Sequence, residues 1–251
     1  KELFLAILAR MNKQTPLMVQ YHQIKARYKD ALLFFQVGDF YELFFDDAVV
    51  ASRFLAITLT KRGKNEGQDI PLCGVPVHAL NFYLTKLVKG GFSVALCDQL
   101  TKPQPGTVVE RAVTKVYTPG TLTDDHMLPE RRASYICAVV AVGQSYEIVA
   151  VELLTAHLLM TVVPLDDVRG LEAELARYAP DEVVVVRGDT AMSALLKKWS
   201  YIVTAFETAQ QGAAGVLREY LGHVQPAIVA HLGEPAVYEP TQYVALDAAT
   251  Q

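Results

Sequence analysis

The 251-residue sequence has few cysteines and no long apolar segment. Its three cysteines, Cys73, Cys97 and Cys137, include no C-x-x-C pair. This argues against a disulfide framework and a zinc site, and it favours a reducing compartment. No apolar run reaches the roughly 18 residues of a membrane-spanning helix, and the amino-terminal segment has no cleavage-type ending of a signal peptide. We therefore expect a soluble, cytoplasmic protein.

The sequence also lacks the common catalytic motifs. It has no G-x-x-x-x-G-K-[ST] phosphate-binding loop, no G-x-G-x-x-G, no H-E-x-x-H and no G-x-S-x-G. Its six histidines are scattered without the spacing of metal ligands. These absences predict that this stretch is not an enzyme and that it binds neither a cofactor nor a metal.

Charge is distributed unevenly along the chain. Residues 1–118 carry 15 Lys and Arg against 10 Asp and Glu, a net charge of +5, whereas residues 119–251 carry 8 against 17, a net charge of −9. A basic half joined to an acidic half indicates two modules with different partners. A net charge of +5 is by itself only a weak indication of nucleic-acid binding.

The residue pattern predicts a mixed α/β fold in two domains. Residues 1–118 follow the order α β α β α β β, with a turn at 38–45, a basic turn at 61–64 and a polar loop over 63–69. A linker is predicted at 119–131 because Pro119-Gly120 opens a polar stretch. The second domain, 132–246, has the order β β β α β α β α of a ribonuclease-H-like sheet. The last residues, 247–251, look like the start of a truncated next domain.

Four aromatic residues crowd the predicted turn after the first strand: Phe40, Tyr41, Phe44 and Phe45. Core packing explains some of them, but a compact domain cannot easily bury all four at one junction. An exposed aromatic ring in a basic module is a candidate for stacking on a nucleic-acid base. As a wedge, such a ring can also unstack and kink a duplex from the minor groove.

A ribonuclease-H-like sheet raises the alternative of a metal-dependent nuclease, which needs several carboxylates converging on its first strands. The first strand of the second domain, 135–142, contains no acidic residue. Glu147 and Glu152 on the next strand are an odd number of residues apart, so they face opposite sides of the sheet. The nuclease stays as an alternative, beside a module that serves only protein interaction.

The segment GDFYELFFDDA, with Phe40-Tyr41-Glu42, resembles the Phe-x-Glu motif of the MutS family of DNA mismatch-repair proteins. The segments around it resemble the family's mismatch-recognition domain in the same order: TPLMVQYHQIKARYKDALLFFQV, LTKRG, IPLCGVPVHALNFYLTKLVKGG and VERAVTKVYTPGT. YVALDAATQ resembles the opening of the family's core domain. The resemblance implies an amino-terminal piece, with a mismatch-recognition domain over 1–118 and a connector domain over 132–246.

The resemblance also implies roles for individual residues. Phe40 would stack on the mispaired base, and Glu42 would form a hydrogen bond with it. Negative surroundings and partial burial both favour a neutral carboxyl group, so we expect a raised pKa for Glu42. Four residues are expected to contact DNA outside the mispaired base, the first two through phosphates and the others, at a helix start, more weakly: Lys61, Arg62, His78 and Asn81.

For the second domain, the resemblance implies a connector that relays signals to an ATPase domain and contacts the MutL partner. Gln210-Gln211 resembles a glutamine pair associated with that contact. The chain then runs directly into Gly212, where family members usually have more residues, so the connector is short or lacks a segment there. ATP and Mg²⁺ are expected only in a carboxy-terminal domain outside this sequence, and the full-length protein is expected to be a homodimer acting on mismatched double-stranded DNA.

Overall fold

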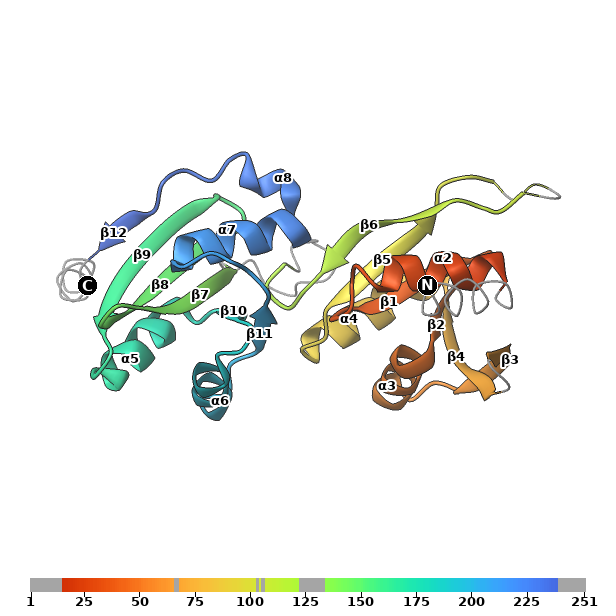
Figure 1. The fold of residues 1–251 in the computed structure, drawn as a ribbon, viewed down its shortest axis with the longest axis horizontal. Coiled ribbons are helices and arrows are strands. Elements are labelled where there is room, and N and C mark those ends of the chain that lie inside the picture. The colour runs from red at the N-terminus through yellow and green to blue at the C-terminus, as the bar shows by residue number, and fades with distance from the viewer. Residues whose placement is uncertain (1–14, 66–67, 103, 105–106, 122–133, 239–251) are drawn as a thin grey trace, which may run out of the picture. The chain divides into compact units, whose positions relative to one another are not determined.

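The computed structural model of the chain describes residues 15–65, 68–102, 104, 107–121 and 134–238. The chain divides into two compact units between Tyr117 and Thr118. Each unit is built on one six-stranded sheet with helices packed on it (Figure 1). The predicted mixed α/β class is confirmed. Within the described ranges, no helix is long and apolar enough to cross a membrane.

The sheet of the first unit has the strand order β3-β4-β2-β1-β5-β6. Neighbouring strands are antiparallel except β1 and β5, which are parallel. The elements of this unit are α2 (Pro16–Lys25), β1 (Leu32–Val37), β2 (Phe40–Phe44), α3 (Phe45–Leu55), β3 (Thr60–Asn65), β4 (Gln68–Pro76), a 3₁₀ turn η1 (Val77–Ala79), α4 (Leu80–Lys89), β5 (Val94–Gln99) and β6 (Arg111–Tyr117).

Two predictions for this unit are wrong. Residues 40–44, predicted as part of a turn, form β2, which pairs with β1 on one side and with β4 on the other. Residues 61–65, predicted as a basic turn and the start of a polar loop, belong to β3, which pairs with β4. The polar composition of β3 hides it from a propensity argument, because its pairing with β4 rather than side-chain burial makes it a strand.

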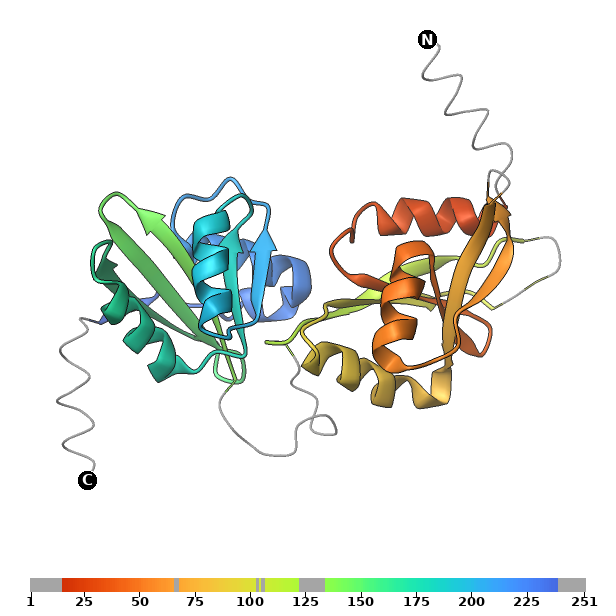
Figure 2. The same ribbon diagram turned by 90° about the horizontal axis from the view of Figure 1, so that it is seen from below.

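The core of the first unit lies on both faces of β1. Leu33, Phe34 and Phe35 are fully buried because α2 covers one face of the sheet while α3 and α4 cover the other (Figures 1 and 2). On the α2 face, the ring of Tyr21 packs edge-on against Phe35 and Phe44, with centroids 5.6 and 5.0 Å away. This helix therefore fixes the last residue of β2.

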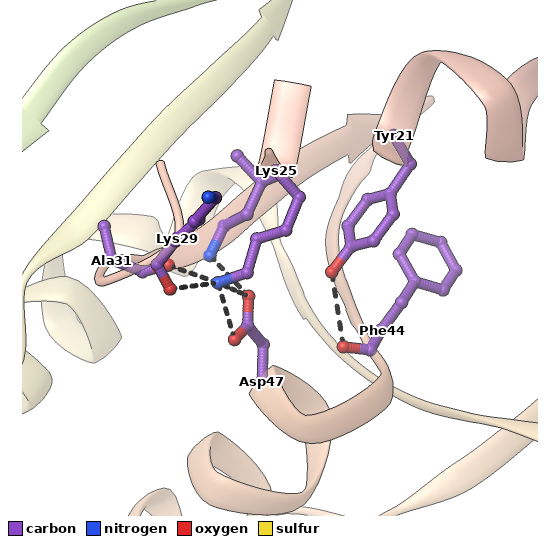
Figure 3. A network of polar contacts seen from close by, with 7 residues as sticks. Tyr21, Lys25, Lys29, Ala31, Phe44 and Asp47 are labelled. Atoms are coloured by element: carbon purple, nitrogen blue, oxygen red, sulfur yellow. Dashed lines mark hydrogen bonds and ion pairs between the residues drawn. The ribbon is translucent and has the colours of Figure 1, made fainter. Parts of the chain in front are cut away.

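A network of polar contacts fastens α2 to the strands (Figure 3). The Nζ atom of Lys25 donates to both carboxylate oxygens of Asp47, at 2.9 and 2.8 Å, and to the carbonyl oxygen of Ala31 at 2.7 Å. Asp47, in the first turn of α3, also accepts a hydrogen bond from the backbone N–H of Leu33 at 3.0 Å. One carboxylate thus connects α2, β1 and α3.

The sheet of the second unit has the strand order β11-β10-β7-β8-β9-β12. Strands β7, β8 and β9 form an antiparallel meander; β10 runs parallel to β7, β11 parallel to β10, and β12 parallel to β9. The elements are β7 (Tyr135–Val142), β8 (Ser145–Glu152), β9 (His157–Pro164), α5 (Val168–Tyr178), β10 (Glu182–Val186), α6 (Thr190–Lys198), β11 (Val203–Phe206), α7 (Ala213–Val224), α8 (Pro226–Val229) and β12 (Ala236–Tyr238). The predicted order is present through α7, and α8 and β12 follow it.

The predicted linker begins inside the second unit. Gly120 donates its N–H, and Thr118 its hydroxyl, to Oε2 of the fully buried Glu182, at 3.0 and 2.6 Å. Thr204 and Tyr220 donate to the other carboxylate oxygen. Four donors around one buried carboxylate anchor residues 118–121 in this unit. The remaining linker residues, and residues 247–251, lie outside the described residues.

Candidate nucleic-acid interface

Phe40 is the residue of the aromatic cluster that the fold leaves exposed. Its relative exposure is 48%, whereas Tyr41 and Phe44 are buried and Phe45 is half-buried. The backbone of Phe40 is held on both sides, since its Cα partners are Val37 in β1 and Pro76 in β4. The sheet therefore presents an exposed ring on a fixed strand.

Strand alternation explains why Phe40 and Tyr41 have different surroundings. Side chains two residues apart share a face of the sheet, so Phe40, Glu42 and Phe44 share one face and Tyr41 lies on the other. On that face, the Tyr41 hydroxyl donates to Oδ1 of Asp98 at 2.6 Å, and burial raises the pKa of Tyr41. Phe44 is covered by α2, whereas Phe40, at the other end of this face, is exposed and Glu42 lies between them with a partly buried side chain.

Glu42 is a largely shielded carboxylate beside the exposed ring. Its side chain retains 17% of its exposure, and its Oε2 lies 2.6 Å from Nη1 of Arg62. Burial raises the pKa of Glu42, and the guanidinium groups of Arg62 and Arg111 oppose this only in part. The raised pKa agrees with the expectation, but the ion pair with Arg62 was not predicted.

The two basic residues predicted to contact phosphates each hold a carboxylate in the structure. Arg62 pairs with Glu42, and Lys61 donates to Asp69 across the hairpin at 2.7 Å. Arg62 lies where the β3–β4 register shifts between Lys61 and Lys64, next to Gly63 with its positive φ of 59°. Bulges of this kind redirect a side chain. Both side chains remain well exposed.

His78 is exposed in η1 and Asn81 is exposed in the first turn of α4, near the carboxyl end of β4. The backbone N–H of Val77 donates to the carbonyl oxygen of Asp39 at 2.9 Å. This bond ties the start of η1 to the turn that precedes Phe40. The structure thus brings the segment with His78 next to the exposed ring, although β4 ends more than 30 residues after β2.

Sequence reasoning missed Arg111. Its guanidinium lies over the ring of Phe35 at 5.0 Å from the centroid, and its Nε donates to the carbonyl oxygen of Gln36 at 2.6 Å. Its Nη1 donates to Oε1 of Gln20 at 3.0 Å. These contacts hold a second positive charge near Glu42. The only indication of its role in the sequence is that Arg111 lies in VERAVTKV, part of a segment that resembles the family's mismatch-recognition domain.

The family described as MutS domain I matches residues 15–126. The DNA mismatch repair protein MutS of Carboxydothermus hydrogenoformans is 38% identical over 252 residues, which cover 94% of this chain and 30% of that protein. The chain belongs to the MutS family. The protein of the same name from Wolbachia pipientis is 34% identical, with 95% and 32% covered, and that from Ruegeria pomeroyi is 47% identical, with 70% and 20% covered. The chain spans less than a third of the length of these MutS relatives.

In the second unit, Gln210 and Gln211 are exposed between β11 and α7. The N–H of Gln210 is held by the Thr208 hydroxyl at 3.0 Å. The chain then continues through Gly212 into α7, where the N–H of Ala213 donates to Glu147 at 2.9 Å. The predicted glutamine pair is therefore accessible, at the end of a short connection.

The carboxylates considered for a nuclease have local partners. Glu147 caps the start of α7, and Glu152 accepts a hydrogen bond from Thr155 at 2.7 Å. In the part of the chain that the structure describes, no three His, Cys, Asp or Glu side chains are grouped as metal ligands would be. No observation on this sheet favours the nuclease alternative.

Proposed function

We propose that the first unit recognises mispaired bases in double-stranded DNA during post-replicative mismatch repair. The observation that carries the proposal is the exposed ring of Phe40, fixed on β2 beside the shielded carboxyl group of Glu42. The segment lies within the match to MutS domain I, and the relatives are named as DNA mismatch repair proteins. The net charge of +5 over residues 1–118 suits a DNA-facing surface.

Phe40 acts as a wedge from the minor groove. A phenyl ring stacked on a base contributes about 1–3 kcal/mol and accepts any base, because every base has a π face. Insertion of the ring unstacks the neighbouring step and kinks the duplex. Mispaired DNA is already weakly stacked, so its deformation costs less than that of matched DNA. The difference in deformation energy gives discrimination without sequence specificity.

Glu42 binds the mispaired base by hydrogen bonding. A charged carboxylate among phosphates is repelled, whereas a neutral carboxyl group donates its proton to a ring nitrogen of the base. The raised pKa of Glu42 favours this neutral form. Lys61, Arg62, His78 and Asn81 contact the DNA around this point and position the duplex rather than read its sequence.

The second unit acts as the connector. In the longer protein, it relays DNA binding to an ATPase domain that uses ATP and Mg²⁺, and the protein acts as a homodimer. The exposed Gln210 and Gln211 belong to its contact surface for MutL. Replacing both by Ala is expected to weaken MutL binding to the longer protein and to leave mismatch binding unchanged.

Phe40→Ala in the longer protein tests the wedge. We expect a loss of about 5- to 150-fold in affinity for a mismatched duplex, which corresponds to 1–3 kcal/mol of stacking, and little change for matched DNA. Phe82→Ala is the matched control, because Phe82 is a phenylalanine of the same unit that is 64% exposed on α4. A Phe40→Ala protein that still prefers mismatched DNA contradicts the proposal.

Glu42→Gln tests the donor role separately. Glutamine keeps an N–H donor without a titratable proton, so mismatch binding is expected to persist and to lose its dependence on pH. Glu42→Ala, which removes the donor, is expected to weaken mismatch binding at every pH. If Glu42→Gln binds mismatched DNA far worse than wild type, the donor role is wrong and the wedge role of Phe40 is unaffected.

A further inference from the structure

The ion pair between Arg62 and Glu42 joins two residues to which the proposed function gives different partners, a phosphate and a base. We infer that Arg62 is a positioning residue that holds Glu42 before DNA binds and passes to a phosphate when Phe40 inserts. Glu42 is then released to take up a proton and bind the base. The inference rests on the proposed function and adds a step to it.

The exposures of the two partners are suited to such an exchange. Glu42 retains 17% of its side-chain exposure, whereas Arg62 retains 45%. The carboxylate is therefore the desolvated partner, and it needs a counter-charge to stay ionised. The guanidinium loses less on leaving, because it is already half in water. Its planar set of N–H donors fits a phosphate as well as it fits a carboxylate.

The element that carries Arg62 has fewer pairing constraints than the strand that carries Glu42. Strand β3 lies at the edge of the sheet and pairs only with β4. Arg62 lies in its irregular stretch, beside Gly63. Glu42, in contrast, lies on β2 between two partner strands. A swing of Arg62 therefore disturbs no central pairing, and the strand with Phe40 and Glu42 stays in place.

The charges around Glu42 define what the exchange changes. Arg62 on β3 and Arg111 on β6 face its carboxylate and both lower its pKa, against the stronger effect of burial. Arg111 is held by Gln20 and Gln36. When Arg62 leaves, Glu42 keeps one of its two positive neighbours, gains phosphates nearby and binds a proton more readily.

Proton uptake gives a measurable consequence. Glu42 has a lower pKa while Arg62 holds it and a higher pKa in the complex. Below the lower value, Glu42 is protonated in both states and mismatch affinity is independent of pH. Between the two values, binding takes up a proton, so log K falls as pH rises, by up to one unit per pH unit for one proton. Above the higher value, the affinity is again constant.

The test measures mismatch affinity against pH in the longer protein for wild type, Arg62→Ala and Lys61→Ala. Removal of Arg62 raises the lower pKa, so the decline of log K is expected to begin at a higher pH. Lys61→Ala is the matched control: it removes the neighbouring positive charge, which pairs with Asp69 and not with Glu42. It is expected to weaken binding without moving the onset. Arg62→Lys, which keeps a charge beside Glu42, is expected to restore the wild-type onset.

Salt dependence tests the second half of the exchange. A phosphate contact contributes about 0.9 to the slope of log K against log salt. If Arg62 reaches a phosphate in the complex, Arg62→Ala is expected to reduce the slope for mismatched DNA by about that amount. In a Glu42→Gln background, the same reduction of the slope is expected, and log K should not depend on pH with or without Arg62, because the titrating group is absent.

The outcomes separate this inference from the proposed function. An unchanged onset in Arg62→Ala, with its melting temperature intact, refutes the hold on Glu42. An unchanged salt slope refutes the passage to a phosphate. Either result leaves the wedge standing if Phe40→Ala has lost mismatch preference. Retained preference in Phe40→Ala removes the basis of both.

Discussion

The carboxylate of Asp47 connects α2, β1 and α3 of the first unit, so its charge is expected to contribute to the stability of that unit (Figure 3). Asp47→Asn keeps the shape of the side chain and one oxygen for the Leu33 N–H, but it removes the charge that Lys25 contacts at 2.8 and 2.9 Å. Hydrogen bonds to charged groups contribute about 1.5–3 kcal/mol, and a negative charge in the first turn of a helix adds about 0.3–1 kcal/mol.

Breaking a fully buried ion pair costs about 3–5 kcal/mol. Here the side chains of Lys25 and Asp47 keep 24% and 10% of their exposure, so water recovers part of the loss. We therefore expect Asp47→Asn to lower the free energy of unfolding of the first unit by about 2–3 kcal/mol. With a urea slope of about 1–3 kcal/mol per molar, this is a shift of about 0.7–3 M in the midpoint.

The assay uses the position of the single tryptophan of the chain, Trp199, which packs against the core of the second unit. Urea unfolding followed by tryptophan fluorescence reports that unit, whereas circular dichroism reports both. Asp47→Asn is expected to move an early part of the dichroism transition and to leave the fluorescence midpoint in place. Asp46→Asn is the control, because Asp46 is exposed in the same helical turn.

Two results would refute this reasoning. One is a loss below about 0.5 kcal/mol, the range of ordinary surface substitutions. The other is an equal cost for Asp46→Asn, which would make the helix dipole, rather than the contacts with Lys25 and Leu33, the source of the effect. In addition, Lys25→Met should cost less in the Asp47→Asn background than in wild type, because the two residues share one interaction.

The remaining predictions concern buried groups, two cysteines in the first unit and one tyrosine in the second. Burial raises the pKa of Cys73 to about 11 and of Cys97 to about 12, so these thiols should react with a thiol reagent only after unfolding. In the unfolded chain the thiol pKa is near 9, so the thiols lose their protons above that pH, whereas the folded chain keeps them. The first unit should therefore lose stability as pH rises from about 9 toward 11. In the second unit, Tyr220→Phe removes a hydroxyl donor 2.6 Å from the buried Glu182. This should lower the urea midpoint of tryptophan fluorescence by an amount that corresponds to about 1.5–3 kcal/mol. A midpoint within error of wild type would show that the remaining donors to Glu182 suffice.

The sequence predicts an element well where the local signal and the tertiary role agree. The start of α2 is an example, since Thr15 caps the helix and Pro16 opens it, a pair of residues that by itself indicates a helix start. β3 is the opposite case, because in TKRGKN only Thr60 favours a strand and pairing with β4 makes it one. β2 was missed for another reason: its five residues follow a two-residue turn so closely that strand and turn were taken together.

The candidate site shows the same limit. The crowding of aromatics predicted that some ring near Phe40 would stay exposed, but alternation on a strand that was not predicted decides which one. Partial burial predicted the raised pKa of Glu42 correctly. The ion pair with Arg62 joins residues 20 apart on two strands that are not neighbours in the sheet. No local sequence pattern predicts such a contact, and none predicts that Arg111 lies near Glu42.

The way in which Phe40 is held bears on how a single ring can discriminate. A wedge on a mobile loop would spend much of its stacking energy, about 1–3 kcal/mol, on ordering its own backbone, at about 1–2 kcal/mol per residue. Phe40 is already fixed by pairing with Val37 and Pro76 and by the bond from Val77 to the preceding Asp39. Stacking energy is then available to deform the DNA. Since matched and mispaired duplexes differ in that deformation energy, a rigid strand makes the difference in binding depend on the DNA rather than on the protein.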